Sequence, residues 1–149
     1  NMPRLEVENV EALLSSAARA ELVRSVLKPA LSEGKHVLCE RFFFSTLAYQ
    51  GYGLGQDTGA LQAISAYAIG GLRPQRVVLL DIDPKEALLR VGRHLDRIEE
   101  RGVEYLQRVR EGYLLLARRE PERFRVVPAA GGIEVVQKRI VEALHDVLP

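Results

Sequence analysis

The chain has 149 residues, which fits one domain and is long enough to bury a core. Apolar residues make up 47% and charged residues 28%, so the composition excludes a disordered chain. The formal net charge of +1 excludes a broad nucleic-acid or acidic-membrane surface, because such surfaces need concentrated positive charge. We expect one domain over residues 1–149, with no nucleic-acid or membrane partner.

Cys39 is the single cysteine of the chain, which excludes an internal disulfide and a zinc site built from cysteines. The apolar residues before it predict a buried thiol and a reducing compartment. No signal-peptide pattern and no apolar run of about 18 residues is visible. These features favour the cytoplasm.

The first predicted element is a long amphipathic helix from Val10 to Leu31, with Gly34 as its stop signal. Its apolar residues recur at helical spacing: Val10, Leu13, Leu14, Ala17, Val23, Val26, Leu27 and Ala30. Ser15, Ser16 and Arg19 share a helical side away from this stripe. By itself, such a polar side with an arginine indicates a solvated face.

A short buried strand is predicted at Val37–Cys39, followed at once by the polar pair Glu40-Arg41. A glycine-rich loop from Gly51 to Gly59 then leads into a helix over about Leu61–Ile69, which the Gly70-Gly71 pair ends. Polar groups at the carboxyl end of a buried parallel strand are where chemistry is expected.

The second half alternates strands and helices. The clearest strand, Arg76–Ile82, is apolar through its middle, and Asp83 with Glu86 forms a capping-box pattern for the next helix. The remaining predicted elements are a helix over about Val103–Arg119, a strand at Phe124–Val127 and a helix from Ile133 to Leu148. This order predicts an α/β fold with an open, mostly parallel sheet that binds ligands at the carboxyl ends of its strands.

The stretch from Gly34 to Gly55 reads GKHVLCERFFFSTLAYQGYGLG. It resembles the thymidylate kinase family, in which a strand ends in Asp-Arg and a Ser-x-x-x-Tyr-Gln-Gly stretch then lines the nucleoside monophosphate pocket. The matching residues are Glu40, Arg41, Ser45, Tyr49, Gln50 and Gly51. The resemblance continues through GGLRPQRVVLLDIDPKEAL, DRIEERG and RVREGYLLLARREPERF, and covers nearly all of residues 13–124.

The resemblance implies a P-loop nucleoside monophosphate kinase-like fold, a three-layer parallel sheet with flanking helices and a lid at about residues 90–102. It also implies transfer of the γ-phosphoryl group of ATP to dTMP, giving dTDP, with Mg²⁺ accompanying ATP and a homodimer as the assembly. We expect dTMP and ATP as the small-molecule partners.

Site residues follow from the resemblance position by position. Arg41 is the candidate for the acceptor phosphate, since arginine can hold a phosphate bidentately. Thr46 would lie beside the thymine edge, and Arg19 would reach the base and phosphate region. Tyr49 would pack against the sugar and disfavour a 2′-hydroxyl, unless it is a core aromatic. The implied dTMP-binding set is Arg19, Glu40, Arg41, Ser45, Thr46, Tyr49 and Gln50.

The lid segment carries arginines at helical spacing, a pattern that by itself usually indicates a solvated face. The resemblance makes Arg93 and Arg97 candidates to neutralise charge on the transferred phosphoryl group, with Arg97 the better candidate. Asp81 could help to order magnesium through water, or could be a structural carboxylate. No residue is expected to bind a metal directly.

The 149 residues contain no G-x-x-x-x-G-K-S/T motif, and the family's first strand and phosphate loop are absent from them. We expect this chain alone not to phosphorylate dTMP. In the family the first strand separates the strands corresponding to 37–39 and 76–82, so we expect that gap to be filled or closed.

Three hypotheses follow: a truncated part of a kinase, an inactive relative that binds nucleotide or dimerises, and one subunit of a split kinase.

Three departures from the family pattern weaken the assignment of dTMP as the substrate. Glu40 replaces an aspartate, Ser15 replaces a stacking phenylalanine and Leu54 replaces an arginine.

Overall fold

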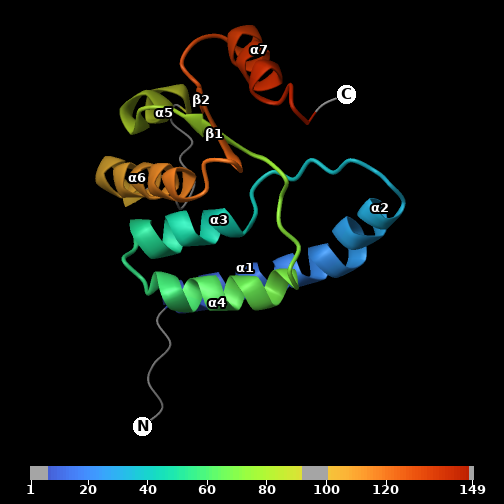
Figure 1. Ribbon diagram of the computed structural model, residues 1–149. Coiled ribbons are helices and arrows are strands. Elements are labelled where there is room, and N and C mark those ends of the chain that lie inside the picture. The colour runs from blue at the N-terminus through green and yellow to red at the C-terminus, as the bar shows by residue number, and fades with distance from the viewer. Residues whose placement is uncertain (1–6, 92–100, 148–149) are drawn as a thin grey trace. The chain divides into compact units, whose positions relative to one another are not determined.

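The computed structural model describes residues 7–91 and 101–147. The chain divides into two compact units, residues 1–73 and residues 74–149 (Figure 1). Each unit is described by itself below.

The described part of the first unit is helical. Its elements are α1 (Val7–Leu22), the π-helical η1 (Val23–Leu27), α2 (Lys28–Ser32), α3 (Phe43–Thr46), the π-helical η2 (Leu47–Gly53) and α4 (Thr58–Ile69). Helices α1 and α4 lie side by side (Figure 1). Helix α3, which follows Arg41 in the chain, packs against both α1 and α4.

The predicted long helix is confirmed in extent, since helical backbone runs from residue 7 to residue 32, but η1 interrupts its regular turns. Pro29 lies just beyond η1 and has no N–H to donate to the preceding turn, which breaks the regular hydrogen-bond ladder.

The buried side of this helix is the expected one only in its second half, at Val23 and Leu27. Ala12, Ser16, Val23 and Leu27 are buried, whereas Leu14 is 66% exposed. The prediction that Ser16 lies on an outer polar side is therefore wrong. Small residues at positions 12 and 16 lie on the buried side of α1, which contacts α4.

The predicted strand at Val37–Cys39 is wrong, because residues 36–40 have no regular secondary structure. Leu38 is 99% exposed, and the Cys39 thiol, expected to be buried, is exposed as well. A strand forms only when a neighbour completes its backbone hydrogen bonds, and the only sheet in the described residues joins two other segments. Without a strand at residues 37–39, the expected gap beside that strand does not arise.

Local signals fix both ends of α4. The Asp57 carboxylate accepts hydrogen bonds from the backbone N–H groups of Gly59 (2.8 Å) and Ala60 (3.2 Å), so the helix begins at Thr58, earlier than expected. Gly70 ends the helix, as predicted, with a left-handed φ of 54°. Gly51 brings η2 close to α4, since a Cβ there would lie 2.9 Å from Thr58 Cγ2.

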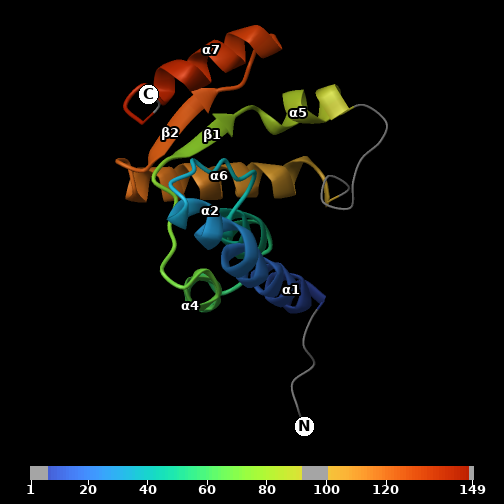
Figure 2. The ribbon, with the colours of Figure 1, turned by 90° about the vertical axis from the view of Figure 1, so that its right-hand side faces the viewer.

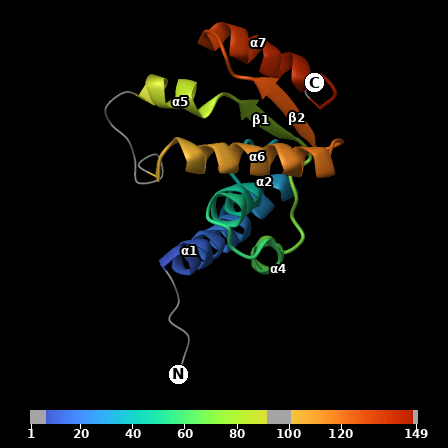
Figure 3. The same ribbon diagram turned by 90° about the vertical axis from the view of Figure 1, so that its left-hand side faces the viewer.

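The second unit is a small α/β layer structure. Its elements are β1 (Val77–Asp81), α5 (Pro84–Val91), α6 (Val103–Arg119), β2 (Phe124–Pro128) and α7 (Ile133–Ala143). The two strands pair in parallel, with Val77 opposite Phe124 and Asp81 opposite Pro128. Helix α7 lies on one side of the strand pair and α6 on the other (Figures 2 and 3). The two predicted apolar strands are confirmed, and their parallel direction agrees with the predicted parallel sheet.

Ion pairs join the last residues of the second unit to its two strands. Asp146, beyond α7, accepts from Arg76 before β1 (2.7 Å) and from Arg125 in β2 (3.0 Å). The expected capping box is half formed, since Asp83 accepts from the Lys85 N–H (2.8 Å) while Glu86 binds Arg90. Helix α7 ends at Ala143, short of the expected Leu148.

Candidate functional site

Arg41 and Tyr49 form the first contact of the candidate site. The guanidinium of Arg41 lies over the Tyr49 ring, with Cζ 4.9 Å from the ring centroid, and its Nη2 donates to the tyrosine hydroxyl over 3.3 Å. Arg41 is exposed and has a φ of 61°, in the left-handed region that residues other than glycine rarely adopt. Strained backbone of this kind is concentrated at functional sites.

Arg19 and Thr46 form the second contact. Nη2 of Arg19, on α1, donates to Oγ1 of Thr46, on α3, over 2.9 Å. Thr46 is only 3% exposed, and the guanidinium of Arg19 also lies 5.8 Å from the centroid of the Phe42 ring. Burial lowers the pKa of Arg19, and the nearby Cys39 partly offsets this effect. The pKa of arginine is so high that the group keeps its charge, so this is a half-buried cation.

The second terminal nitrogen of Arg19 is buried and has no acceptor in the described part of the chain. Buried polar atoms normally find a partner, and an ordered water commonly supplies it. Three other side-chain atoms of this unit share that state: Ser16 Oγ, Gln56 Oε1 and Ser65 Oγ.

Other predicted residues lie on the same stretch of chain. Ser45 is half-buried on α3 and Gln50 is half-buried on η2, whereas Glu40 is exposed before α3. The structure thus brings Arg19 to Thr46 and Arg41 to Tyr49 within one unit. Chemically, Arg41 can hold an anion, while Arg19 and Thr46 can present hydrogen-bonding groups to a polar ligand edge.

Phe42 and Gln56 also belong to this part of the unit, although neither was predicted from the sequence. Phe42 is half-buried and contributes its ring to Arg19, and its position beside Arg41 was a usable signal. Gln56 follows the helical pocket segment, and its N–H donates to the Gln50 carbonyl over 3.2 Å. No local pattern marks that glutamine, because its burial depends on how the chain folds back after η2.

Asp81 at the carboxyl end of β1 is held by an arginine on α6. Its two oxygens accept from Nε (2.6 Å) and Nη2 (2.9 Å) of Arg110. The hydrogen bonds from Arg110 lower the pKa of Asp81, although partial burial opposes that effect. This pairing supports the structural alternative for Asp81.

A protein-built magnesium site is not apparent in residues 7–91 and 101–147. No group of three His, Cys, Asp or Glu side chains there could hold a metal ion, and the Asp81 carboxylate is engaged by Arg110. These residues therefore do not fit a metal held by the protein alone. Arg93 and Arg97 lie outside the described residues.

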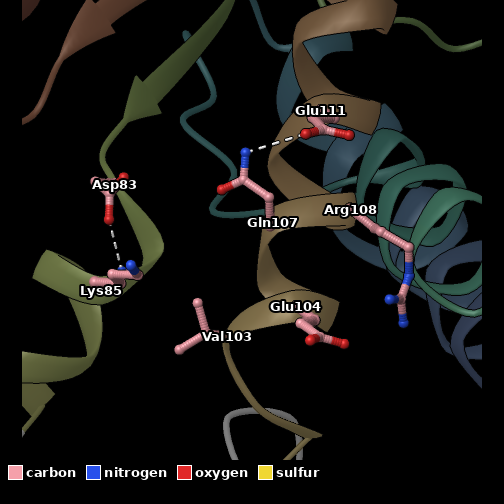
Figure 4. A pocket seen from close by; sticks show the side chains of 7 residues that line it. All are labelled: Asp83, Lys85, Val103, Glu104, Gln107, Arg108 and Glu111. Atoms are coloured by element: carbon pink, nitrogen blue, oxygen red, sulfur yellow. Dashed lines mark hydrogen bonds between the residues drawn. The ribbon is translucent and has the colours of Figure 1, made fainter.

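A hollow of about 480 Å³ lies in the second unit, between the start of α5 and the first half of α6. Asp83, Lys85 and residues of α6, among them Gln107 and Glu111, line it, and Gln107 donates to Glu111 over 3.1 Å (Figure 4). The lining mixes carboxylates and cations, so charge alone favours no class of ligand. None of the predicted dTMP-binding residues lines it.

Among the described residues, no helix combines the length and the apolar character that crossing a membrane would require.

The family model described as thymidylate kinase matches residues 3–140. The thymidylate kinase of Symbiobacterium thermophilum is 51% identical over 140 residues, covering 93% of this chain and 65% of that protein. The thymidylate kinase of Pelotomaculum thermopropionicum is 47% identical over 141 residues, covering 93% and 65%.

A solved structure agrees with these relatives. The crystal structure of thymidylate kinase from Ehrlichia chaffeensis matches with a TM-score of 0.74 and 26% identity, covering 97% of this chain and 70% of that one. The chain spans 65% of the length of the two relatives named above. The predicted nucleoside monophosphate kinase-like fold and the resemblance are confirmed, and the chain belongs to the thymidylate kinase family.

Proposed function

We propose that the protein acts in the thymidylate kinase reaction, in which the γ-phosphoryl group of ATP passes to dTMP to give dTDP and ADP. The observation that carries this proposal is the match of the thymidylate kinase family model to residues 3–140, a range that contains the contact of Arg19 with Thr46 and that of Arg41 with Tyr49. Mg²⁺ would arrive with ATP.

The acceptor end of the proposed site is Arg41. Arg41 is exposed and lies five residues before Thr46, which is proposed to contact the base. This position suits an arginine that holds the dTMP phosphate. In this proposal Thr46 meets the thymine edge, Tyr49 packs against the deoxyribose, and Ser45, Gln50 and Glu40 complete the pocket. Arg93 and Arg97 are proposed to act on the transferred phosphoryl group from the lid.

A competition between nucleotides tests the base assignment. Calorimetric titration should show tighter binding of dTMP than of dGMP, because Arg19 and Thr46 are proposed to contact the edge of a thymine base. Equal affinities would contradict a thymine-reading site. A coupled assay of ADP release with ATP, Mg²⁺ and dTMP then measures turnover separately.

A second candidate is a family member that binds the nucleotide without phosphorylating it. Ser15 favours it, since this exposed serine stands where the resemblance places a stacking phenylalanine, and Leu54 replaces an arginine. Loss of an aromatic platform would weaken base binding by about 1–3 kcal/mol, by analogy with bases stacked on aromatic side chains. Because this chain alone is expected not to release ADP under either candidate, dTMP affinity is the test: about ten-fold tighter dTMP binding by Ser15→Phe would support this candidate.

A homodimer belongs to the proposal, and an exposed apolar stripe on α1 supports it. Val10 (40%), Leu13 (43%) and Leu14 (66%) are exposed, together with Ala17, at the spacing of one helix face. We call these four residues the α1 stripe. Exposed apolar patches of this kind commonly bind another protein surface, and we propose a second copy of the chain. A cytoplasmic location is proposed from the single cysteine.

A further inference from the structure

Tyr49 contacts Arg41 in two ways. The ring face lies 4.9 Å from the guanidinium carbon, and the hydroxyl oxygen accepts from Nη2 over 3.3 Å. We infer that Tyr49 is a positioning residue, whose ring holds the Arg41 guanidinium ready for the nucleotide phosphate. This inference rests on the proposed function, because it needs dTMP as the ligand.

The two residues differ in how firmly the backbone holds them. Arg41 precedes α3, outside any helix, and its φ of 61° is unfavourable for a residue with a side chain. Tyr49 lies within η2, which approaches α4 so closely at Gly51 that a Cβ would come within 2.9 Å of Thr58 Cγ2. The ring is thus attached to packed helical structure, and the arginine is not.

A long arginine side chain loses conformational freedom when it binds a phosphate, and that loss weakens binding. A ring that already fixes the guanidinium removes part of the loss before the ligand arrives. The ring face attracts the cation without using its N–H groups, and the tyrosine hydroxyl accepts from Nη2 alone. Most of the guanidinium donors therefore stay available to phosphate oxygens.

This role differs from the sugar contact that the resemblance implies. A sugar contact acts on thymidine and dTMP alike, whereas positioning of Arg41 acts only on ligands that carry the phosphate. The ratio of the two affinities separates the roles.

The test is a calorimetric comparison of dTMP with thymidine on the whole chain and four variants: Tyr49→Phe, Tyr49→Leu, Arg41→Ala and the double variant Arg41→Ala/Tyr49→Leu. Tyr49→Phe keeps the ring and should leave the dTMP-to-thymidine preference within about two-fold. Tyr49→Leu should reduce that preference about three- to ten-fold. In the Arg41→Ala background, Tyr49→Leu should change it no further, because the two residues act together.

An equal loss of dTMP and thymidine binding in Tyr49→Leu, or additive effects in the cycle, would overturn the inference and leave the proposed function standing. A wild-type chain that binds neither ligand would overturn both. If Tyr49→Leu does not fold, the NMR shifts of the Arg41 δ protons in the wild-type chain and in Tyr49→Phe decide the contact. Upfield ring-current shifts support the inference, and random-coil shifts overturn it.

Discussion

The guanidinium of Arg19 is held by Thr46 through a 2.9 Å hydrogen bond across 27 residues of sequence, and this contact joins α1 to α3. Thr46→Val keeps the side-chain shape but removes the acceptor. The half-buried cation then has neither terminal nitrogen paired in the described site. We expect a loss of about 1–3 kcal/mol in the free energy of unfolding, measured by urea titration, and weaker dTMP binding.

Ser65→Ala is the matched control for that change. The Ser65 hydroxyl is fully buried and has no partner within the described residues, so its removal should be neutral or stabilising. If both variants destabilised the protein equally, the Arg19 to Thr46 hydrogen bond would not be the cause.

The left-handed backbone at Arg41 predicts that the residue trades stability for binding. Arg41→Gly and Arg41→Ala both remove the guanidinium, but only glycine relieves the backbone. The glycine variant should be more stable than the alanine variant by about 0.5–1 kcal/mol in chemical unfolding. Equal stabilities would mean that the conformation at residue 41 carries no strain.

The pairing of Asp81 with Arg110 predicts a pH dependence of stability. Hydrogen bonds from Arg110 lower the folded-state pKa of Asp81, so its contribution is present above the unfolded pKa of about 3.9 and is lost as the pH falls through the folded value. Asp81→Asn should cost about 1–2 kcal/mol at pH 7 and should flatten the acid side of the stability profile. Unfolding curves at pH 7 and at several acidic pH values measure both effects. An unchanged acid slope would contradict the assignment.

The α1 stripe predicts the assembly. Leu14→Glu places a charge at the centre of the exposed stripe and should convert the proposed homodimer to a monomer in sedimentation velocity experiments. Gln62→Glu adds a negative charge at an exposed position of α4 outside the stripe and serves as the control. Dimers in both variants would show that another surface makes the contact.

The sequence predicted correctly those helices and strands whose formation depends mainly on residues close to them in the chain. The apolar run of β1, the Gly70 end of α4 and the spacing of α6 all depend on nearby residues. The start of α4 at the Asp57 cap was not predicted. The segment at 37–39 has the same apolar character as β1, yet forms no strand, since a strand also needs a distant partner. Burial is equally non-local, which explains why Ser16 is buried and Leu14 is exposed.

The sequence likewise identified residues of the candidate site but not the contacts between them. Resemblance identified Arg41, Thr46 and Tyr49 from one stretch of sequence. The contact between Arg19 and Thr46 and the ring contact between Arg41 and Tyr49 depend on helix packing and on the π-helical turn of η2, which no spacing rule predicts.

Residues 41–50 and Arg19 are proposed to bind the nucleoside monophosphate, with Arg41 on its phosphate. Calorimetric titration of dTMP into the wild-type chain, Arg41→Ala and Arg97→Ala tests this proposal most directly. Loss of charge-assisted hydrogen bonds should weaken binding in Arg41→Ala by about ten-fold or more, whereas Arg97→Ala, in the proposed lid, should bind within about two-fold of wild type. Equal losses in the two variants, or full dTMP affinity in Arg41→Ala, would contradict the account.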